Sequence, residues 1–410
     1  MKYLIGISGS IACYKSIDVA RQLVKNGHEV KVILTAGALE FIKPDIFRYL
    51  GIEAAYLPTD DFDPRNLSKN STVLHIELVK WADKLIIAPA SANTLGRLAM
   101  GITNDLLTSV FLAFGNKPTL LFPAMNTQMW QNARVQEHIA KLMNLPQVGV
   151  VNPVSGLLAC GDVGAGKFPE VGAVVDLIET FNPIKKQNKK VIITAGATAA
   201  PLDPVRFLTN PSSGKMGLEV AKAFLREGYD VTVLAGHQCT EEVNYLLGHP
   251  NFNLRKTPTT ELMKVVAVEL FPQADLYIST GAIADIEFDV HASKMKKEQM
   301  GEPLKFHQAA DILAHILKLK KANQKVVSFA AETETTEAVF MEKMNRKPVD
   351  LMVGNKVGNG LIGETEVKGF QKDHGEYFFV EPKKIHGPHP LKKKEIGNKL
   401  VQWFEGQSAW

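Results

Sequence analysis

Short apolar segments alternate with amphipathic segments along the chain, and this alternation predicts strands and helices in turn. Tyr3–Ile7 is an apolar run with the length of a buried strand, and the segment after it has helical spacing from Gly9 and Ser10 to a stop at Gly27. Glu29–Leu34 predicts the next strand. Strand, helix and strand in this order predict a βαβ unit of an open parallel sheet, where the helix start faces the ligand crevice and attracts anions.

The same pattern recurs in both halves of the chain, and a lysine-rich segment separates the two series. Residues 182–190 contain a proline and no apolar period, which indicates a linker between domains 1–181 and 191–410. The predicted fold class is α/β, with two Rossmann-like open parallel-sheet domains in tandem. The other predicted segments are the strands Lys84–Ala88, Thr119–Phe122, Val191–Thr194, Asp230–Leu234 and Asp275–Ser279 and the helix Lys215–Glu227.

A glycine-rich stretch, Gly156–Glu170, interrupts this pattern. Its glycines favour neither helix nor strand and predict a mobile loop, in which Cys160 lies among charged residues as on a lid over a site. A surface turn, in which the cysteine is only a small apolar residue, explains the same composition equally well.

The C-terminal tail predicts a hairpin around Asp373–Gly375 and a last helix over Lys392–Phe404. Between them, His386 and His389 belong to the segment HGPHP. Prolines are expected to break this segment into a loop without the rigid spacing that a metal site needs, so no metal ligands are predicted.

Length, cysteine count and charge narrow the class of protein. A chain of 410 residues is long enough for two or three domains. The three cysteines are far apart and form no CxxC pair, so neither a disulfide framework nor a zinc site is expected, and a reducing cytoplasm fits. The sequence contains no run of about eighteen apolar residues, so no membrane span is predicted. The net charge of +4 is too small to indicate a nucleic-acid partner.

Two segments at predicted strand ends have the composition of a phosphate site. Gly6–Ala12 brings small residues to the first helix start but does not form GxGxxG, and Thr35 rather than an acidic residue follows the second strand. A mononucleotide or flavin phosphate site is therefore predicted rather than an NAD site. Ser91–Thr94 gathers small hydroxyl and amide groups at another helix start, which again suits a phosphate.

Two polar residues of the first half are candidate catalytic groups that also have structural explanations. Asn126 follows a predicted strand, where ligand-contacting groups of such sheets lie, but it is equally suited to cap a helix. His75 is a single histidine in an apolar run, a setting in which a structural role is more common than a functional one.

Five motifs of the first half resemble those of a known family, in the same order. They are SGSIA from Ser8, the single His75, APASANT from Ala88, PAMNTQMW from Pro123 and ACGD from Ala159. This half resembles the flavin-dependent cysteine decarboxylases, specifically the decarboxylase half of the bifunctional phosphopantothenoylcysteine decarboxylase/phosphopantothenate–cysteine ligases of coenzyme A biosynthesis. The resemblance implies trimers, often four of them in a dodecamer, with FMN and substrate held between neighbouring subunits.

The resemblance also assigns roles to single residues. FMN oxidises the substrate thiol, which provides the electron sink for loss of CO2. His75 would serve the oxidative decarboxylation, Asn126 would bind the substrate carboxylate, and Cys160 would donate a proton. Lys167 stands where the family has arginine, and it keeps the charge without the bidentate fork. The residues predicted to bind FMN are Gly9, Ser10, Ile11, Thr35, Ser91, Asn93 and Thr94.

The second half resembles the ligase domain of the same bifunctional enzymes. Its motifs are DPVRFLTNPSSGKMG from Asp203, KMKK from Lys294 and SFAAET from Ser328. The amides of Ser212–Gly214, ahead of a predicted helix, form a candidate anion nest. The resemblance implies a dimeric ligase that uses CTP and Mg2+ and forms an acyl-cytidylate before the amine of cysteine attacks.

Within the ligase half, the resemblance assigns Lys294 to acyl-cytidylate formation and Asn210 to stabilisation of that intermediate. Charge that develops on phosphate in the transition state requires fixed cations, which agrees with the lysine. The residues predicted to bind CTP are Ser279, Asp285, Lys294, Ala310, Asp311, Ile312, Leu313, Phe329, Lys343 and Lys347.

Three departures from the family pattern lie in the second half and remove charges near the expected nucleotide or cysteine pocket. Thr198–Pro201 replaces Thr-Arg-Glu-Pro, Ile286 and Glu287 replace an aromatic and a basic residue, and Gly354–Lys356 replaces Ala-Asn-Asp. The predicted function is synthesis of 4'-phosphopantetheine from 4'-phosphopantothenate, cysteine and CTP. The alternatives are an active decarboxylase with an impaired ligase, a decarboxylase of C-terminal peptidyl cysteines, and a non-catalytic phosphatase-regulating relative.

Overall fold

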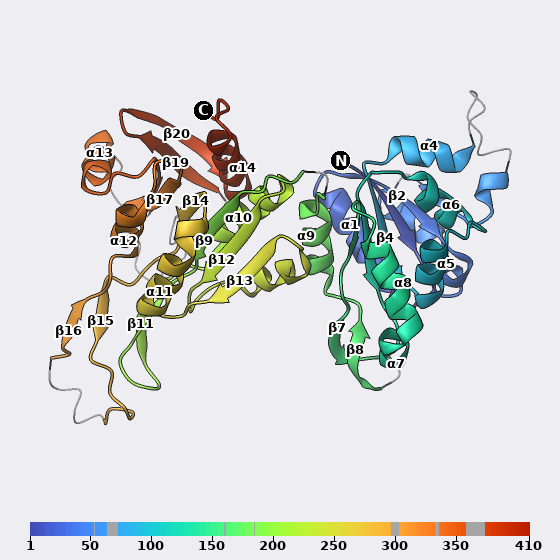
Figure 1. Ribbon diagram of the computed structural model, residues 1–410, viewed down its shortest axis with the longest axis horizontal. Coiled ribbons are helices and arrows are strands. Elements are labelled where there is room, and N and C mark those ends of the chain that lie inside the picture. Colours follow the sequence, from blue (N-terminus) through green and yellow to red (C-terminus); the bar gives the residue numbers. More distant parts are fainter. Residues whose placement is uncertain are drawn as a thin grey trace. The chain divides into compact units, whose positions relative to one another are not determined.

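The computed structural model describes residues 1–410 apart from 53, 64–72, 160, 184, 297–302, 333–335 and 358–373. Its internal contacts divide the chain into two units, Met1–Lys185 and Lys186–Trp410. Each unit contains its own open sheet with helices on both faces (Figure 1). This arrangement confirms the predicted α/β fold class.

The first unit is built on an open parallel sheet. Its strands are β1 (Lys2–Ile7), β2 (Glu29–Leu34), β3 (Ala54–Tyr56), β4 (Lys84–Ala90), β5 (Thr119–Pro123) and β6 (Val148–Val150). Their order is β3-β2-β1-β4-β5-β6, so the winding direction reverses between β1 and β4. In the register of these central strands, Ile5 lies opposite Val32 on one side and Ile86 on the other.

Helices cover both faces of this sheet because side chains alternate along each strand. Tyr3, Ile5 and Ile7 of β1 pack toward one face and Leu4 toward the other. The first face is covered by α1 (Cys13–Lys25), α2 (Ala36–Leu39), α3 (Asp45–Tyr49) and α9 (Val171–Thr180). The second face is covered by α4 (Leu74–Trp81), α5 (Ala92–Met100), α6 (Leu106–Ala113) and α8 (Ala133–Met143). The short helices η1 (Asp60–Phe62) and α7 (Thr127–Gln131) lie in the connections.

The second unit repeats this winding and then extends it. Its main strands are β9 (Lys190–Ala195), β12 (Asp230–Ala235), β13 (Phe252–Lys256), β14 (Leu276–Ser279), β17 (Lys325–Glu332), β18 (Leu351–Lys356), β19 (His374–Glu381) and β20 (Lys384–Lys392). Their order is β13-β12-β9-β14-β17-β18-β19-β20, with parallel pairing up to β18 and antiparallel pairing after it. The reversal of direction here falls between β9 and β14.

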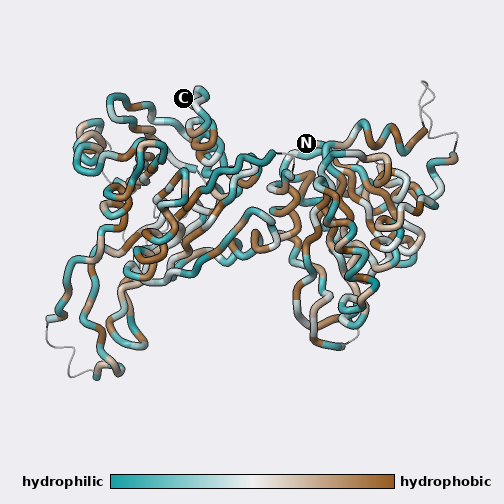
Figure 2. Tube along the Cα trace, in the orientation of Figure 1, coloured by the Kyte–Doolittle hydropathy of each residue, from teal (hydrophilic) through white to brown (hydrophobic). Residues whose placement is uncertain are grey.

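Helices again cover both faces of the second sheet. On one face lie α10 (Lys215–Arg226), α14 (Lys393–Phe404) and η3 (Glu241–Gly248). On the other lie α11 (Thr260–Leu270), η4 (Phe271–Gln273), α12 (Ile312–Leu319) and α13 (Glu337–Arg346). Two antiparallel ribbons project from this unit, β10 (Ala199–Pro201) with β11 (Phe207–Thr209) and β15 (Ile286–Phe288) with β16 (Phe306–Gln308). Figure 2 shows hydrophobic residues concentrated along the strands of both sheets.

The C-terminal tail differs from its prediction in two respects. The last helix is confirmed, but the hairpin of β19 and β20 turns at residues 382–383, and Gly375 lies within β19. The HGPHP segment lies in β20 and is not a loop. Proline is tolerated there because β20 is an edge strand, and Gly387 takes φ +124° where the register shifts. Asp373 lies outside the described residues.

A buried hydroxyl joins the two central strands of the first unit at their carboxyl ends. The Ser8 Oγ donates to the Pro89 carbonyl at 2.7 Å and accepts from the Ser91 N–H at 2.7 Å. Ser8 is fully buried, so no water replaces these bonds. The spacing between the loops after β1 and β4 is therefore set by one side chain.

Replacement of Ser8 by alanine should destabilise the first unit by about 2 kcal/mol, because the Pro89 carbonyl loses a buried donor and the half-buried Ser91 N–H loses its acceptor. Urea unfolding of the full-length protein, followed by circular dichroism, measures this change. Ser155→Ala, which removes an exposed hydroxyl, should change the free energy of unfolding by less than about 0.5 kcal/mol. Equal effects of the two substitutions would show that Ser8 does not join the strands.

Candidate functional site

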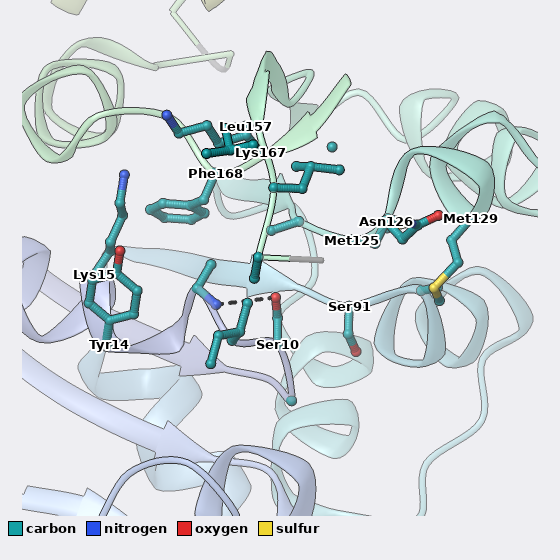
Figure 3. Close-up of a pocket in the computed structure, with 18 residues that line it drawn as sticks. Ser10, Tyr14, Lys15, Ser91, Met125, Asn126, Met129, Leu157, Lys167 and Phe168 are labelled. Atoms are coloured by element: carbon teal, nitrogen blue, oxygen red, sulfur yellow. Dashed lines mark hydrogen bonds between the residues drawn. The ribbon is translucent and has the colours of Figure 1, made fainter. Parts of the chain in front are cut away.

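A cavity of about 500 Å3 lies in the first unit beyond the carboxyl ends of β1 and β4 (Figure 3). Gly9, Ser10 and Ile11 line it from the loop after β1, and Ser91 lines it from the loop after β4. Ligands of open parallel sheets bind at this point, where the winding direction reverses. Four of the residues predicted to bind FMN are therefore together in one cavity.

The other three residues predicted to bind FMN do not line the cavity. Thr35 caps α2 by accepting from the Ala38 N–H at 3.3 Å. The buried Thr94 hydroxyl accepts from Ser91 Oγ at 3.2 Å and so supports the loop after β4. Asn93 is exposed. Their part in FMN binding stays a prediction.

The residues around this cavity fit a flavin. Large apolar side chains at its edge remain about half exposed, at 54% for Ile11, 57% for Tyr14 and 48% for Met129. A planar aromatic ring would cover this apolar surface, while the hydroxyls of Ser10 and Ser91 suit polar groups and phosphate. Cofactor pockets typically combine such apolar walls with a few polar groups.

The glycine-rich segment is an antiparallel ribbon and not the predicted loop. It consists of β7 (Val154–Leu157) and β8 (Val163–Lys167). A Cβ at Gly166, where φ is +142°, would lie 2.2 Å from the Met125 carbonyl oxygen, and one at Gly164 would lie 2.5 Å from Thr127 Oγ1. The prediction was wrong because these glycines permit close contact with a neighbouring segment rather than mobility.

The ribbon covers the cavity of the first unit. Figure 3 shows Leu157 and Lys167 on the side of the cavity opposite Ser10. The Gly166 carbonyl accepts from the Met125 N–H at 3.1 Å, which attaches the ribbon to the segment after β5. Cys160 lies between β7 and β8 in the sequence but outside the described residues, so its role stays a prediction.

Asn126 caps a helix, as one explanation of its sequence position predicts, and its contact with a ligand stays a prediction. Its Oδ1 accepts from the Gln128 N–H at 2.8 Å and caps α7, while its side chain lines the cavity. Its Nδ2 lies 3.5 Å from the Asp162 carboxylate on the ribbon. Because the cap holds Oδ1 in place, Nδ2 is the group of this side chain that faces the ribbon.

His75 lies on α4 and is paired with a carboxylate. Its Nδ1 is 2.7 Å from Asp61 Oδ2, and the Asp61 side chain is only 8% exposed. The carboxylate favours the proton on Nδ1 and leaves Nε2 as the available ring nitrogen. His75 does not line the cavity of its own chain. Sequence reasoning missed Asp61, since a partner 14 residues away gives no local signal.

The second unit has a larger, more polar cavity of about 520 Å3 at the corresponding place, beyond β9 and β14. Ser212–Gly214 lines it at the start of α10, as the predicted anion nest requires. Other lining residues that sequence reasoning did not name as ligands include Arg346, Asn355 and Lys393. The residues predicted as ligands that line it are Asn210, Asp285, Leu313, Phe329, Lys343 and Lys347.

A buried hydroxyl joins the central strands here too. The Thr194 Oγ1 accepts from the Gly281 N–H at 3.0 Å, and the Thr194 carbonyl accepts from Thr280 Oγ1 at 2.5 Å. Thr194 is fully buried. Two hydrogen bonds thus tie the loop after β14 to β9.

Ion pairs hold two of the lysines in this cavity. Lys343 pairs with Glu332, and Lys347 lies 2.7 Å from Asp311 Oδ2. Burial, together with the nearby charges of Arg346 and Lys347, lowers the pKa of Lys343. Burial opposes ionisation of Asp311, but hydrogen bonds from Lys347 and from the backbone N–H at the start of α12 hold its pKa below the usual value.

Asp311 therefore acts on the cavity through Lys347, since it does not line the cavity itself. Ala310 and Ile312, its neighbours in the sequence, are not lining residues either, and Ser279 ends β14 without lining the cavity. Their predicted contacts with CTP stay predictions.

Lys294 is exposed and does not line the cavity. Asp203 is the first residue of the motif DPVRFLTNPSSGKMG, and it anchors the backbone next to Lys294. Its carboxylate accepts from the N–H groups of Met295 at 3.2 Å and Val205 at 2.8 Å. Burial opposes ionisation of Asp203, but these bonds and the Arg206 charge lower its pKa. Sequence reasoning named this motif without assigning Asp203 a role.

Two of the three departures from the family pattern have local explanations in packing. Ala199 and Ala200 are buried where the family has charged residues, and neither lines the cavity. A Cβ at Gly354 would lie 2.3 Å from the Phe340 ring, so glycine fits the aromatic side chain packed there.

Among the described residues, no helix is long and apolar enough to cross a bilayer, and no cluster of three or more His, Cys, Asp or Glu side chains is arranged to hold a metal ion.

Gly166→Ala should displace the ribbon from the Met125 segment, because the added Cβ has no room and alanine disfavours φ +142°. We expect a loss of flavin affinity of about tenfold or more, measured by fluorescence titration of the apoprotein. Gly115→Ala is the control, since Gly115 also has positive φ (+65°) but its Cβ would meet nothing within 4 Å. Equal flavin affinity of the two variants would contradict a role for the ribbon in covering the cavity.

Two family models match the chain. Flavoprotein matches residues 1–183, and the DNA/pantothenate metabolism flavoprotein C-terminal domain matches residues 186–406. A solved structure of the FMN binding protein AtHal3 is 35% identical, with a TM-score of 0.38, and covers 43% of this chain and 94% of that one.

Curated relatives match almost the whole chain. The coenzyme A biosynthesis bifunctional protein CoaBC of Haemophilus influenzae is 35% identical over 371 residues, which is 90% of this chain and 90% of the relative. The protein of the same name from Escherichia coli K12 is 35% identical over 412 residues, covering 98% and 95%. The chain belongs to the family of bifunctional coenzyme A biosynthesis proteins, CoaBC.

Proposed function

We propose that the chain is a cytoplasmic bifunctional enzyme that makes 4'-phosphopantetheine. The second unit joins 4'-phosphopantothenate to cysteine with CTP and Mg2+, and the first unit decarboxylates the product with FMN. The observation that carries this proposal is the pair of cavities at equivalent points of two sheets, one mainly apolar and one rich in charged groups. Membership of the CoaBC family supports it.

In the decarboxylase, the chemistry that bound FMN would supply is that of an electron acceptor for the substrate thiol. Gly9 and Ser10 of the β1 loop and Ser91 of the β4 loop hold the cofactor. Asn126, which lines the cavity, binds the substrate carboxylate. The β7–β8 ribbon limits access of water, and Cys160, which lies between these strands in the sequence, returns a proton to the carbon from which CO2 has left.

His75 acts on a neighbouring subunit's cavity in this proposal. Asp61 holds its ring with Nε2 available, but the residue does not line the cavity of its own chain. The half-exposed apolar side chains of Ile11 and Tyr14 provide surface that a neighbouring subunit would bury. A homo-oligomer with trimers of decarboxylase units follows, and dimers of ligase units would join them, up to a dodecamer.

In the ligase, the nucleotide occupies the second cavity. The Ser212–Gly214 amides and the lysines at 343 and 347 bind its phosphates, and Phe329 lies beside the base. Asn210 stabilises the acyl-cytidylate, and Lys294 approaches the reacting phosphate from the projecting β15–β16 segment. The residues that bind Mg2+ are not assigned.

A decarboxylase with an impaired ligase is the second candidate. The absence of the family's charges at Ala199 and Ala200 motivates it, although neither residue lines the nucleotide cavity. The purified protein, supplied with phosphopantothenate, cysteine, CTP and Mg2+, distinguishes the two. Release of both pyrophosphate and CO2 is expected from the bifunctional enzyme. Release of CO2 from supplied phosphopantothenoylcysteine, without pyrophosphate from CTP, would establish the second candidate.

Cys160→Ser should slow formation of the reduced product by about 100-fold or more, because a proton donor is lost. The decarboxylated but still oxidised product should accumulate and be detected by mass spectrometry. Cys239→Ser is the control, since Cys239 belongs to the second unit. Normal output of phosphopantetheine by Cys160→Ser would refute the donor role.

Lys294→Gln should reduce CTP-dependent pyrophosphate release by about 100-fold or more, because a cation is removed from the reacting phosphate. Decarboxylation of supplied phosphopantothenoylcysteine should continue at the wild-type rate. Lys296→Gln removes the same charge two residues away and should retain most ligase activity. Loss of decarboxylation in Lys294→Gln, or an equal loss of ligase activity in both variants, would contradict the assignment.

A further inference from the structure

A buried serine of the second unit has a hydroxyl that the described part of the chain does not pair. Ser328, on β17, is 5% exposed, and its Oγ has no hydrogen-bond partner among the described residues. A hydroxyl carries one donor and two acceptor lone pairs, and folded proteins pair nearly all such groups when they are buried. Burial of this hydroxyl therefore costs free energy that a ligand could recover.

Ser328 lies at the nucleotide cavity, the cavity of about 520 Å3 in the second unit, and lines it together with Phe329–Glu332. Val326 and Ala330, two residues before and after it, pack in the core that α11, α12 and α13 cover. Because side chains alternate along a strand, Ser328 points to the same face. Met352 lies opposite Ser328 in the register with β18 and lines the cavity from that face too.

The fold uses another hydroxyl of the same row. The register places Thr194, Ser279 and Ser328 side by side on β9, β14 and β17. The Thr194 hydroxyl accepts from the Gly281 N–H at 3.0 Å and so ties two strands together. The Ser328 hydroxyl forms no such bond to the described residues. A buried hydroxyl that does not serve the fold but borders a ligand cavity is suited to contact the ligand.

The surroundings of Ser328 indicate which part of a nucleotide it would meet. Leu313, Ala330 and Met352, which line the cavity on this face, are apolar. A phosphate instead requires charge or several N–H donors, which the lysines of α13 and the Ser212–Gly214 nest provide. A nucleobase has apolar faces and a polar edge, so apolar walls with a single hydroxyl suit the base.

We propose that the Ser328 hydroxyl forms a hydrogen bond to the polar edge of the base of the bound nucleotide. The proposal rests on the proposed ligase function, in which this base is the cytosine of CTP. The oxygen itself is covered, and rotation about the Cα–Cβ bond to another staggered position brings it to the base. This rotation breaks no hydrogen bond of the oxygen to any described residue.

The cavity extends across the end of β17, because Phe329 lines it although it packs against the core on the opposite face. A base that lies across the strand end meets both Phe329 and Ser328. A site that hydrogen-bonds one group of its ligand discriminates against ligands without that group, since the buried partner is then left unpaired. Ser328 is therefore a residue that determines which base the cavity accepts.

Calorimetric titration of the full-length protein with CTP, ATP and inorganic tripolyphosphate tests the contact in Ser328→Ala. We expect the affinity for CTP to fall about tenfold, because one hydrogen bond in a buried site is lost. ATP has the same ribose and triphosphate as CTP, but its purine places the polar edge elsewhere. The affinities for ATP and tripolyphosphate should therefore change by less than about twofold.

The Tm of the nucleotide-free variant should rise by about 2 °C or more, because a buried, unpaired hydroxyl is removed. Thr257→Val is the matched control. Thr257 is fully buried, its hydroxyl donates to the Ala235 carbonyl at 3.3 Å, and it does not line the nucleotide cavity. The control should have a lower Tm and an unchanged affinity for CTP.

Unchanged affinity for CTP in Ser328→Ala, or an equal loss for CTP and ATP, would overturn the proposal. A fall in both Tm and CTP affinity would show that the hydroxyl serves the fold, which overturns it as well. Failure of the ligase function gives a different result. Ser328-dependent binding of CTP by a protein that releases no pyrophosphate would retain the contact and refute the ligase. Normal pyrophosphate release with equal CTP affinities would refute the contact alone.

Discussion

Two buried hydroxyls, those of Ser8 and Thr194, connect the central strands of the two sheets at the points where the winding direction reverses. At such a point the loops after the two strands diverge toward opposite faces of the sheet, and a crevice remains between them. Each hydroxyl ties one central strand, or the residue that follows it, to the backbone after the other central strand. The positions of the proposed FMN and nucleotide sites depend on this constraint.

The same frame supports different chemistry because the residues after the strands differ. In the first unit, Ile11 and Tyr14 give the cavity an apolar edge that suits a planar cofactor, and the β7–β8 ribbon covers it. In the second unit, the nest at Ser212–Gly214 and the lysines of α13 provide donors and charge for phosphates. Function is therefore determined by loops on a repeated scaffold, as is usual for this class of fold.

The central strands, their helices and the position of both cavities could be predicted because each follows from local periodicity and from the parallel-sheet rule. The β7–β8 ribbon could not, since Gly164 and Gly166 serve a close contact with a segment distant in the sequence. Asp61 beside His75 was missed for the same reason. Sequence motifs identified Lys294, whereas only the fold shows that the buried Ser328 hydroxyl has no hydrogen-bond partner among the described residues.

Hydrogen exchange of backbone amides tests most directly whether both ligands bind at the reversal points. Mass spectrometry of the full-length protein would compare the apoprotein with the FMN-loaded and the CTP-loaded forms. The account predicts that FMN protects peptides containing Gly9 and Ser91, and that CTP protects peptides containing Ser212–Gly214 and Gly281. Protection of both sets by one ligand, or protection away from the β1–β4 and β9–β14 loops, would contradict it.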